Sequence, residues 1–360
     1  MAKNKSKLTL LVDGNWLLMS RLYVISNKYV DDNELCINLK SMLTKSISIV
    51  LRQFPDIDNV IIVSDGGSWR NYVDVPEFLK KDNIVYKGNR IKSDDMNWDI
   101  IFKTYNDWMQ DLSKNGLTIC REELIEGDDW AWYWSTKLNS ENTNVIIWSK
   151  DKDLTQLVNM NKDKCFTIWW NADNGMYYKD IPKDVDEDFG FLLNAYYNEN
   201  EKCFNNIVKA CKKSTAIDNN SVILEKIVRG DAGDNIQPII LKKAKNPAST
   251  KKFKVAQRDI DYTINIHDDN AVKAWLEDLY YNKGYDGKTD KTIDEAFTHF
   301  KYNRQLIALE KDVYPNNVLE KFDNYKTYKC SKDIIIVEAQ QQAQQNTHSQ
   351  IQMAQRHIIG

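Results

Sequence analysis

The sequence predicts an α/β fold in which a mainly parallel central sheet is flanked by helices. Three short apolar runs, Leu8–Val12, Asn59–Val63 and Val145–Trp148, have the length and composition of buried strands. They alternate with stretches of helical periodicity, which is typical of βαβ units and therefore of parallel sheets. Each run is followed within three residues by an aspartate, at the strand end where open α/β sheets bind their ligands.

The first half of the chain carries most of these strand and helix patterns. Residues 16–54 are largely helical with a polar break at 31–33, and Pro55 ends the pattern. In a further helix, over 94–112, aromatic side chains three or four residues apart share one face, which we interpret as core packing rather than as a substrate contact. The other expected elements are helices at 126–139 and 151–159 and strands at 117–120, 144–148, 165–170 and 176–179.

The second half is mostly helical from residue 186 onward. Ten of the eleven tryptophans precede residue 171, so the aromatic-rich α/β part ends near that point. We predict helices at 221–229, 269–282, 289–309 and 316–327. The expected domains are an α/β domain over 1–182, a helical domain over 183–330 and a glutamine-rich disordered tail over 339–360.

Composition narrows the class of protein. The chain of 360 residues is 42% hydrophobic and 28% charged, and no apolar run approaches the roughly 18 residues of a membrane span. Its six cysteines form no CxxC pair and its four histidines lie late and far apart, which argues against a Cys/His zinc site and indicates a reducing compartment. We therefore expect a cytoplasmic protein, in the host cytoplasm if a phage encodes it. The net charge of −3 argues against a nucleic-acid partner unless the negative charge is concentrated in a metal site.

Acidic side chains gather where the predicted strands end and where the next helix begins. They are Asp13, Asp65, Glu126, Asp128, Asp129, Asp151 and Asp153. Carboxylates that converge on one edge of a sheet raise one another's pKa, unless a cation holds them ionised. For Asp128 and Asp129 alone, enrichment of the first turn of a helix is an equally good interpretation.

The candidate ligands are all hard oxygens, which favour Mg²⁺, with Mn²⁺ as a substitute. Two or more such ions, about 4 Å apart, can hold the attacking water and the leaving oxygen of a displacement at phosphorus. No histidine base is needed, because a cation lowers the pKa of water to near neutrality. The sequence therefore predicts a divalent-metal site for phosphate chemistry.

Six short motifs follow one another along the chain, namely VDG, SDGGSWR, YKGNR, EGDD, SKDKD and GDAGDNI. Together and in this order they resemble the flap endonuclease-like 5′ nucleases, and among these the phage enzymes of the T-even RNase H type. The resemblance covers roughly residues 8–330. It implies a PIN-like central sheet, a helical arch over about 86–115, and a C-terminal helical domain that binds DNA through a degenerate helix-turn-helix.

The resemblance also implies roles for individual residues. Metal ions would be held directly or through water by Asp13, Asp65, Glu126, Asp128, Asp129, Asp151, Asp153, Asp231 and Asp234. Lys87 and Arg90, in the segment that leads into the arch, would contact the scissile phosphate and act in catalysis. Tyr86 and Arg70 would contact DNA, with a structural role as the alternative for Arg70.

A basic stretch from Lys242 to Arg258 follows the GDAGDNI motif. We expect Lys242, Lys243 and Lys245 to contact the phosphates of DNA, and the alternative is a solvated face. Here the chain departs from the pattern of the family, which has a glycine-rich hairpin that binds duplex DNA and often a potassium ion. In this chain Gln237–Leu241 is followed by lysines instead.

The implied activity is that of a metal-dependent 5′-3′ exonuclease and flap endonuclease. Its substrates would be DNA with a 5′ flap or an RNA–DNA hybrid, and it would remove RNA primers and flaps during replication. We expect a monomer that does not bind membranes and that contacts replication proteins such as a single-strand binding protein or a sliding clamp. Two alternatives stay open, a PIN-type ribonuclease and a DNA-junction binding protein without catalytic activity.

Overall fold

A computed structural model describes most of the chain and divides it into two compact units. The described residues are 7–25, 31–80, 85–90, 96–160, 165–171, 173, 175–179, 207, 211–244, 251–285, 290–325 and 331–344. Unit 1 comprises Met1–Gly67, Ser93–Ala216 and Lys321–Gly360, and unit 2 comprises Ser68–Lys92 and Ile217–Glu320. Neither unit is continuous in the sequence. The segment Ser68–Lys92, which carries the SWR and YKGNR motifs, therefore belongs to unit 2 and not to the α/β unit as the expected boundary at 182 implied.

Unit 1 is built on an eight-stranded sheet with the order β3-β2-β1-β4-β6-β7-β8, and β5 pairs with β6. The strands are β1 Lys7–Asp13, β2 Asn59–Val63, β3 Thr118–Cys120, β4 Thr143–Trp148, β5 Asn159–Met160, β6 Phe166–Asn171, β7 Gly175–Lys179 and β8 Cys211–Ile217. The pairs β1–β2, β1–β4, β2–β3 and β4–β6 are parallel, whereas β5 and β7 run antiparallel to β6. The predicted α/β class with a mainly parallel central sheet is confirmed.

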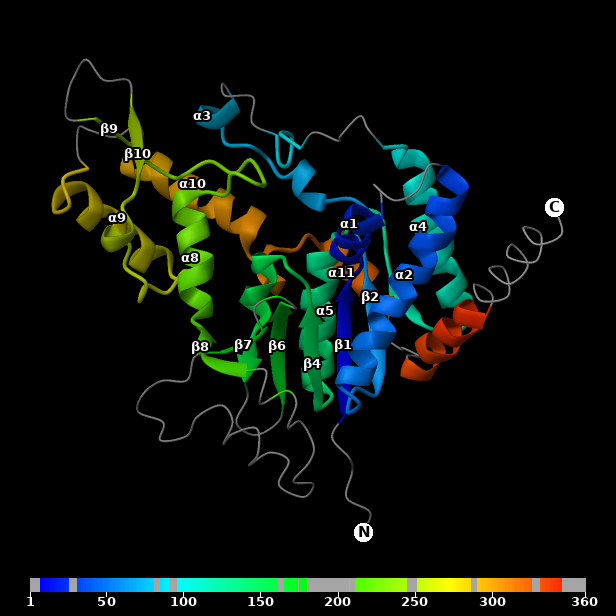
Figure 1. Cartoon of the computed structure of the whole chain (residues 1–360). Coiled ribbons are helices and arrows are strands. Elements are labelled where there is room, and N and C mark those ends of the chain that lie inside the picture. Colours follow the sequence, from blue (N-terminus) through cyan, green and yellow to red (C-terminus); the bar gives the residue numbers. More distant parts are fainter. Residues whose placement is uncertain are drawn as a thin grey trace, which may run out of the picture. The chain divides into compact units, whose positions relative to one another are not determined.

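Helices cover the two faces of this sheet. The helices of unit 1 are α1 Gly14–Ile25, α2 Asp32–Gln53, α4 Trp98–Lys114 and α5 Gly127–Ser140. Leu8, Leu10 and Val12 alternate along β1 and share one core with buried side chains of α1, α2 and α4. Helix α5 packs against the opposite face (Figure 1). Alternation along the strand directs the side chains between Leu8, Leu10 and Val12, and also that of Asp13, to this face.

Local sequence explains where the helices begin. Asp31 caps α2, because its carboxylate accepts hydrogen bonds from the N–H groups of Asn33 and Glu34. In α4, Tyr105 and Trp108 are each 2% exposed and lie in the core, as the core-packing interpretation of the aromatic face requires. This face therefore supports α4 against the sheet.

Several elements differ from the expectation. The segment after β4 forms a 3₁₀ helix, η2 Lys152–Leu157, followed by β5, where we expected one α-helix over 151–159. Strand β8 lies within a stretch expected to be helical. Residues 332–344 are helical and the side chain of Ile335 is fully buried, so the first residues of the expected disordered tail continue a packed helix. Residues 345–360 lie outside the described part of the chain.

Unit 2 is mainly helical. Its helices are α3 Glu77–Lys80, α8 Asn219–Arg229, α9 Asp269–Tyr281 and α10 Ile293–Ile307, and α11 Asn316–Asp323 starts in unit 2 and ends in unit 1. Short 3₁₀ turns occur at η1 Trp69–Tyr72, η3 Gln257–Asp259 and η4 Lys311–Val313. Helix α10 packs against α8 and α9, with Leu224, Leu276 and Phe300 buried in a common core. The basic stretch forms an antiparallel hairpin of β9 Leu241–Lys243 and β10 Lys252–Lys254, which the sequence did not predict.

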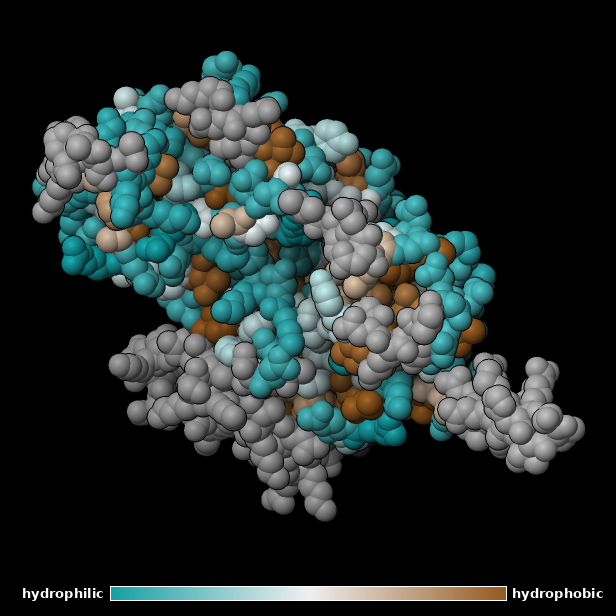
Figure 2. Space-filling model, turned by 45° about the horizontal axis from the view of Figure 1, so that its top comes forward, coloured by the Kyte–Doolittle hydropathy of each residue, from teal (hydrophilic) through white to brown (hydrophobic). Residues whose placement is uncertain are grey.

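Figure 2 shows hydrophilic residues over most of the visible described surface, with apolar residues in separate small areas. None of the described helices combines the length and the apolar character that crossing a bilayer would need.

Candidate metal centre

The carboxyl ends of β1, β2 and β4 meet at one edge of the sheet because these strands are parallel neighbours. Asp13 is the last residue of β1 and pairs with Val63 of β2, while Val12 pairs with Trp148 of β4. Asp65 lies two residues after the end of β2, and Asp151 lies three residues after the end of β4. The register therefore gathers three of the predicted carboxylates, as the sequence analysis expected.

Asp13 is the most buried of these three carboxylates, with 8% of its surface exposed. Its Oδ1 accepts a hydrogen bond from the N–H of Trp16 at 3.0 Å, and its Oδ2 accepts one from the Ser149 hydroxyl at 2.6 Å. Burial, together with the charges of Asp65 and Asp151, raises the pKa of Asp13 to about 7, although the two hydrogen bonds act to lower it. Among the described residues, none of the groups that shift the pKa of Asp13 is a cation that would stabilise its ionised form.

Asp65 is held between a side chain and a helix N-terminus. Its Oδ2 accepts a hydrogen bond from the Asn15 amide at 2.6 Å, and its Oδ1 accepts one from the N–H of Gly127 at 2.6 Å. Asn15 also accepts hydrogen bonds from the Ser64 hydroxyl at 2.7 Å and from the N–H of Asp65 at 3.2 Å. Asn15 therefore fixes the end of β2 from the first turn of α1.

Two glycines let the start of α5 approach the end of β2. A Cβ atom on Gly66 would lie 1.9 Å from the carbonyl oxygen of Glu122, and the N–H of Gly66 donates to the carbonyl of Ile125 at 2.9 Å. A Cβ atom on Gly127 would lie 3.2 Å from Oδ1 of Asp65. These close backbone contacts bring the first turn of α5 to the carboxylate of Asp65.

The three acidic residues at the start of α5 differ in their surroundings. Glu126 is the N-cap of the helix, and its N–H donates to Oδ2 of Asp129 at 3.0 Å in a capping box. Asp129 is fully buried, and its carboxylate caps the N-terminus of α5. This agrees with the alternative interpretation of Asp128 and Asp129 as acidic residues of a first helical turn. Asp128 is half-buried in the first turn.

Ser149 connects Asp13 to the loop that carries Asp151 and Asp153. Its hydroxyl donates to Asp13 and accepts a hydrogen bond from the N–H of Asp151 at 2.9 Å. Asp151 caps the 3₁₀ helix η2, because its Oδ1 accepts from the N–H of Asp153 at 2.9 Å. Asp151 is exposed and Asp153 is half-buried, so both are open to solvent at this edge.

The sequence analysis did not identify Asn15, Ser64 and Ser149. Each lies directly before or shortly after a strand-end aspartate, and this adjacency was the available signal. Tyr105 completes the group, since its hydroxyl lies 3.2 Å from that of Ser64 and burial raises the pKa of its phenol. These polar residues hold the strand-end aspartates in place.

The predicted phosphate-contacting residues lie in unit 2 and meet Asp234. The Arg90 guanidinium lies 2.5 Å from Oδ1 of Asp234, and the Lys87 ammonium lies 3.9 Å from Oδ2. The Tyr86 hydroxyl donates to Oδ2 at 3.3 Å, and the N–H of Lys87 donates to the backbone carbonyl of Asp234 at 2.9 Å. Asp234 therefore orders the YKGNR segment within this unit.

Asp231 also has a cationic partner in unit 2. Its Oδ2 accepts from the Lys226 ammonium at 2.7 Å, and its Oδ1 accepts from the N–H of Gly233 at 2.8 Å. Burial alone would raise the pKa of Asp231, but the ion pair with Lys226 and the N–H donors outweigh it and lower the pKa. Asp231 and Asp234 thus differ from Asp13, because each of them forms an ion pair with a neighbouring lysine or arginine.

The remaining predicted DNA-contacting residues fall into three cases. Arg70 is 4% exposed, and its Nε donates to the carbonyl of Leu306 at 2.8 Å, which supports the structural alternative for this residue. Lys242 and Lys243 lie in β9 of the hairpin. Lys245 lies outside the described residues.

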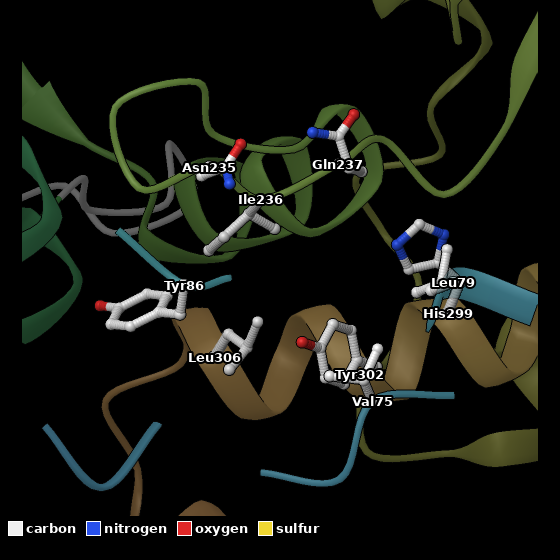
Figure 3. Close-up of a pocket in the computed structure, with 9 residues that line it drawn as sticks. All are labelled: Val75, Leu79, Tyr86, Asn235, Ile236, Gln237, His299, Tyr302 and Leu306. Atoms are coloured by element: carbon white, nitrogen blue, oxygen red, sulfur yellow. The ribbon is translucent and has the colours of Figure 1, made fainter. Parts of the chain in front are cut away.

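A small pocket in unit 2 adjoins Tyr86. Figure 3 shows Tyr86 facing Leu306 beneath Asn235 and Ile236, with His299 at the far end of the same pocket. Its volume of about 10 Å³ leaves room for one water molecule at most. Burial lowers the pKa of His299 to about 3, so the imidazole is neutral. This pocket reflects the packing of the Ser68–Lys92 segment and offers no site for a nucleotide.

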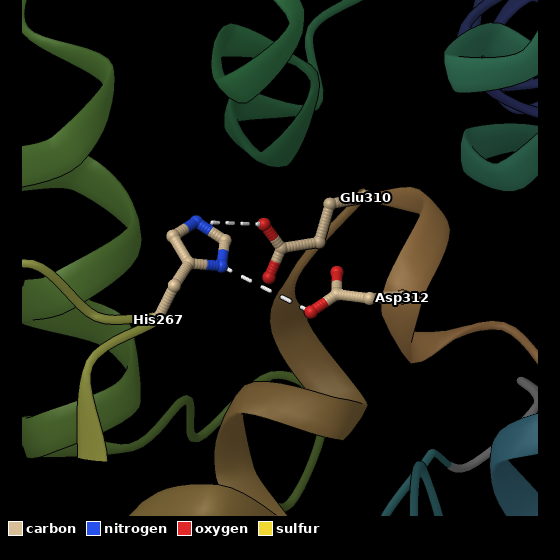
Figure 4. Close-up of side chains that lie close together, drawn as sticks. All are labelled: His267, Glu310 and Asp312. Carbon is tan, nitrogen blue, oxygen red and sulfur yellow. Dashed lines mark ion pairs between the residues drawn. The ribbon is translucent and has the colours of Figure 1, made fainter.

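Among the described residues, one group of His and acidic side chains has its ligand atoms within 4.8 Å of one another, and it is not the predicted site. It consists of His267, Glu310 and Asp312 (Figure 4). The Arg304 guanidinium already lies 2.6 Å from Glu310 and 2.5 Å from Asp312, and 2.8 Å from Nδ1 of His267. A metal ion is not favoured there, because the guanidinium supplies the positive charge.

Comparisons with known proteins agree with this architecture. Residues 8–190 match the family described as 5′-3′ exonuclease, N-terminal resolvase-like domain. A 5′-3′ exonuclease from Mycoplasmopsis pulmonis is 30% identical over 162 residues, which are 44% of this chain and 48% of that relative. The matched stretch thus spans about half the length of that protein.

Two solved structures share the fold. One is a T5 protein co-crystallised with metal ions, at 17% identity and a TM-score of 0.53, and the match covers 88% of this chain and 97% of that chain. The other is the T5 5′-exonuclease with zinc bound, also at 17% identity, with a TM-score of 0.51 and the same two coverages.

The sheet with acidic strand ends and the family match define the class of the protein at the level of the 5′-3′ exonuclease family, and the predicted resemblance to 5′ nucleases is confirmed at this level. The chain belongs to the family of 5′-3′ exonucleases that carry the N-terminal resolvase-like domain, because the match spans just over half of its residues.

The raised pKa of Asp13 predicts a pH-dependent penalty on the stability of the metal-free protein. A carboxyl whose folded pKa is about 7, against an ordinary pKa of 3.8, destabilises the fold as pH rises from about 4 to 7. Asp13→Asn should therefore raise the free energy of unfolding in EDTA at pH 8, by at most about 4 kcal/mol, and should change it little at pH 4. Urea unfolding at both pH values measures this difference.

The exposed Glu277 on α9 provides a matched control. Glu277→Gln removes the same charge from a solvated position, so the stability difference from the wild type should not depend on pH. If Asp13→Asn behaved like this control, the burial and charge coupling of Asp13 would be refuted.

Proposed function

We propose that this protein is a divalent-metal-dependent, structure-specific 5′ nuclease that hydrolyses phosphodiester bonds near 5′ ends. It would remove flaps and RNA primers, acting on DNA with a 5′ flap or on an RNA–DNA hybrid. The observation that carries the proposal is the convergence of Asp13, Asp65 and Asp151 at the carboxyl ends of three parallel strands. Membership of the 5′-3′ exonuclease family supports the same activity.

The donor set fits a divalent cation. The candidate ligands are carboxylate oxygens, which suit Mg²⁺ and Mn²⁺. The buried Asp13, with its pKa of about 7, gains from a positive charge that would hold it ionised at neutral pH. When bound, such an ion supplies the charge that acidifies water and offsets negative charge at phosphorus. The full proposed set is Asp13, Asp65, Glu126, Asp128, Asp129, Asp151, Asp153, Asp231 and Asp234, with two or more ions.

The structure suggests a ranking within this set. Asp13, Asp65 and Asp151 are coupled electrostatically and stand at strand ends. Asp129 closes the capping box of α5, so a supporting role behind Glu126 and Asp128 suits it better than direct ligation. The cations that neutralise Asp231 and Asp234 in unit 2 would compete with a metal for these two carboxylates.

Lys87 and Arg90 would bind the scissile phosphate and stabilise the charge that develops on it. In unit 2 both cations already surround an anion, the carboxylate of Asp234. A phosphate presents the same kind of oxygens to the same donors. Asp234 would therefore hold Lys87 and Arg90 ordered in the free protein, and phosphate would replace it when substrate binds.

Two alternative functions can each be distinguished from the proposed nuclease by one observation. A PIN-type ribonuclease would cleave single-stranded RNA, and a silent junction-binding protein would bind a flap without cutting it. Cleavage of a 5′-labelled flap substrate in Mg²⁺, compared with single-stranded RNA and with an EDTA control, separates the three. We expect cleavage of the flap, with no cleavage in EDTA, and cleavage of single-stranded RNA alone would contradict the proposal.

The finer assignments belong to the same proposal. We take Mg²⁺ as the physiological ion, a monomer as the working form and the cytoplasm, of a host cell if a phage encodes the protein, as its location. Binding to a single-strand binding protein or a sliding clamp is proposed for replication. Tyr86 would support Lys87 and Arg90 through Asp234 in addition to any contact with DNA.

Asp151 and Asp153 should be needed for turnover but not for binding. Asp151→Asn or Asp153→Asn should reduce the single-turnover rate on a flap substrate by at least about 100-fold, because each removes a charge that faces the ion. Affinity for the flap should hold or increase, since one source of repulsion for phosphate is lost. Asp107→Asn, on the exposed face of α4, is the control and should cleave normally. Near-normal cleavage by both Asp151 and Asp153 variants would show that the metal assignment is wrong.

Lys87 and Arg90 should affect the chemical step more than substrate affinity. Replacing either by Ala should lower the single-turnover rate by about 100-fold or more, because the interaction is made with charge that develops in the transition state. Lys45→Ala removes an exposed lysine of α2, outside the expected arch, and should have no effect. A change confined to the dissociation constant would assign the two residues to positioning of DNA instead.

A further inference from the structure

The hairpin of β9 and β10 separates the lysines of the basic stretch onto two faces. Antiparallel pairing places Lys252 opposite Lys243, Phe253 opposite Lys242 and Lys254 opposite Leu241. Directly opposite residues share a face, and successive residues of a strand alternate between faces. Lys243, Lys252 and Lys254 therefore point to one side of the hairpin, and Lys242 and Phe253 point to the other.

The exposure of the lysine side chains agrees with this division. Lys243, Lys252 and Lys254 are all exposed, whereas Lys242 is half-buried. The Lys242 ammonium lies 4.1 Å from the ring centroid of Tyr285, a side chain that is 2% exposed. Lys242 thus packs on the helical unit through a cation–π contact, and the other three lysines form what we call the lysine face.

The base of the hairpin is tied firmly to unit 2. The Tyr285 hydroxyl donates to Asp259 at 3.1 Å and accepts from the N–H of Ala256 at 3.1 Å. The N–H of Leu241 donates to Asp290 at 2.9 Å, and Val255, which follows β10, is fully buried. The lysine face is consequently presented on an anchored element and not on a free loop.

Gathering three lysines on a two-stranded hairpin costs stability. Like charges directly opposite each other, as in the pair of Lys243 and Lys252, repel across the strands. Lys252 and Lys254 are two residues apart on one strand, about 7 Å. Within the described part of the chain, none of these three lysines forms an ion pair that would offset the repulsion. A polyanion bound to this face would offset the repulsion between the lysines.

We propose that the lysine face of Lys243, Lys252 and Lys254 binds the phosphate backbone of the duplex part of the substrate, and that Lys242 anchors the hairpin instead. A DNA duplex presents about one negative charge per 1.7 Å of its axis, a line of charge that several neighbouring lysines can contact at once. This inference rests on the proposed function, because it takes the polyanion to be the nucleic-acid substrate. It assigns duplex binding to a β-hairpin, at the point where the chain lacks a glycine-rich hairpin.

The salt dependence of duplex binding tests the assignment. Fluorescence anisotropy of a labelled 5′-flap duplex in EDTA, over a range of KCl concentrations, gives the slope of log affinity against log salt. The triple variant Lys243→Gln, Lys252→Gln, Lys254→Gln should flatten this slope by up to about 2.7, or about 0.9 per lost phosphate contact. The single variant Lys242→Gln should leave the slope unchanged.

Two further variants control for net charge and for folding. Lys273→Gln, Lys301→Gln, Lys311→Gln removes three exposed lysines elsewhere in unit 2 and should not change the slope. Arginines at positions 243, 252 and 254 should restore the wild-type slope, which a merely structural defect of the hairpin would not allow.

The outcomes are separable from the proposed function. The slope is measured in EDTA without turnover, so it reports duplex binding whether or not the protein cleaves the flap. If the triple glutamine variant had the wild-type slope, the inference would be overturned, and the lysine face would be assigned to solvent or to an acidic protein partner. The inference would also be overturned if Lys242→Gln flattened the slope as much as the triple variant does. Absence of cleavage by the wild type would refute the proposed nuclease, while the slopes would still decide whether the hairpin binds duplex.

Discussion

Repulsion between carboxylates at one edge of the sheet is the constraint on which the rest of this structure depends. Parallel pairing of β1 with β2 and β4 brings Asp13 to Asp65 and Asp151, and burial adds to the cost of ionising Asp13. Hydrogen bonds from Ser149 and Asn15 hold these groups in place but do not neutralise them. The fold therefore keeps an anionic site that a divalent cation can stabilise.

In unit 2, cationic side chains of the protein itself neutralise the acidic residues of the GDAGDNI motif. Asp231 pairs with Lys226, and Asp234 pairs with Arg90 and Lys87. The hairpin carries further positive charge, because exposed lysines lie opposite each other there and form no ion pair with the described acidic residues. Unit 1 thus carries an excess of negative charge at its strand ends, and unit 2 carries cations suited to phosphate. This division is compatible with the proposed nucleic-acid substrate even though the net charge of the chain is −3.

The sequence predicted the elements whose signal is local. Apolar runs located the central strands, and an aspartate after each strand located the acidic edge of the sheet, because both features are set by adjacent residues. Asn15 and Ser149 were not predicted, since their roles depend on the register of one strand against another. The hairpin was not predicted either, because a run of lysines has low strand propensity and this pairing is fixed by distant residues such as Tyr285 and Asp290. The placement of Ser68–Lys92 in unit 2 is likewise a tertiary effect.

The most direct test of this account is to locate the metal itself. Crystals grown with Mn²⁺ and measured near the manganese absorption edge reveal each bound ion as an anomalous peak. The account predicts a peak at the carboxyl ends of β1 and β4, within coordination distance, about 2.2 Å, of oxygens of Asp13 or Asp151. Absence of manganese from this edge, or a peak only at His267, Glu310 and Asp312, would contradict it.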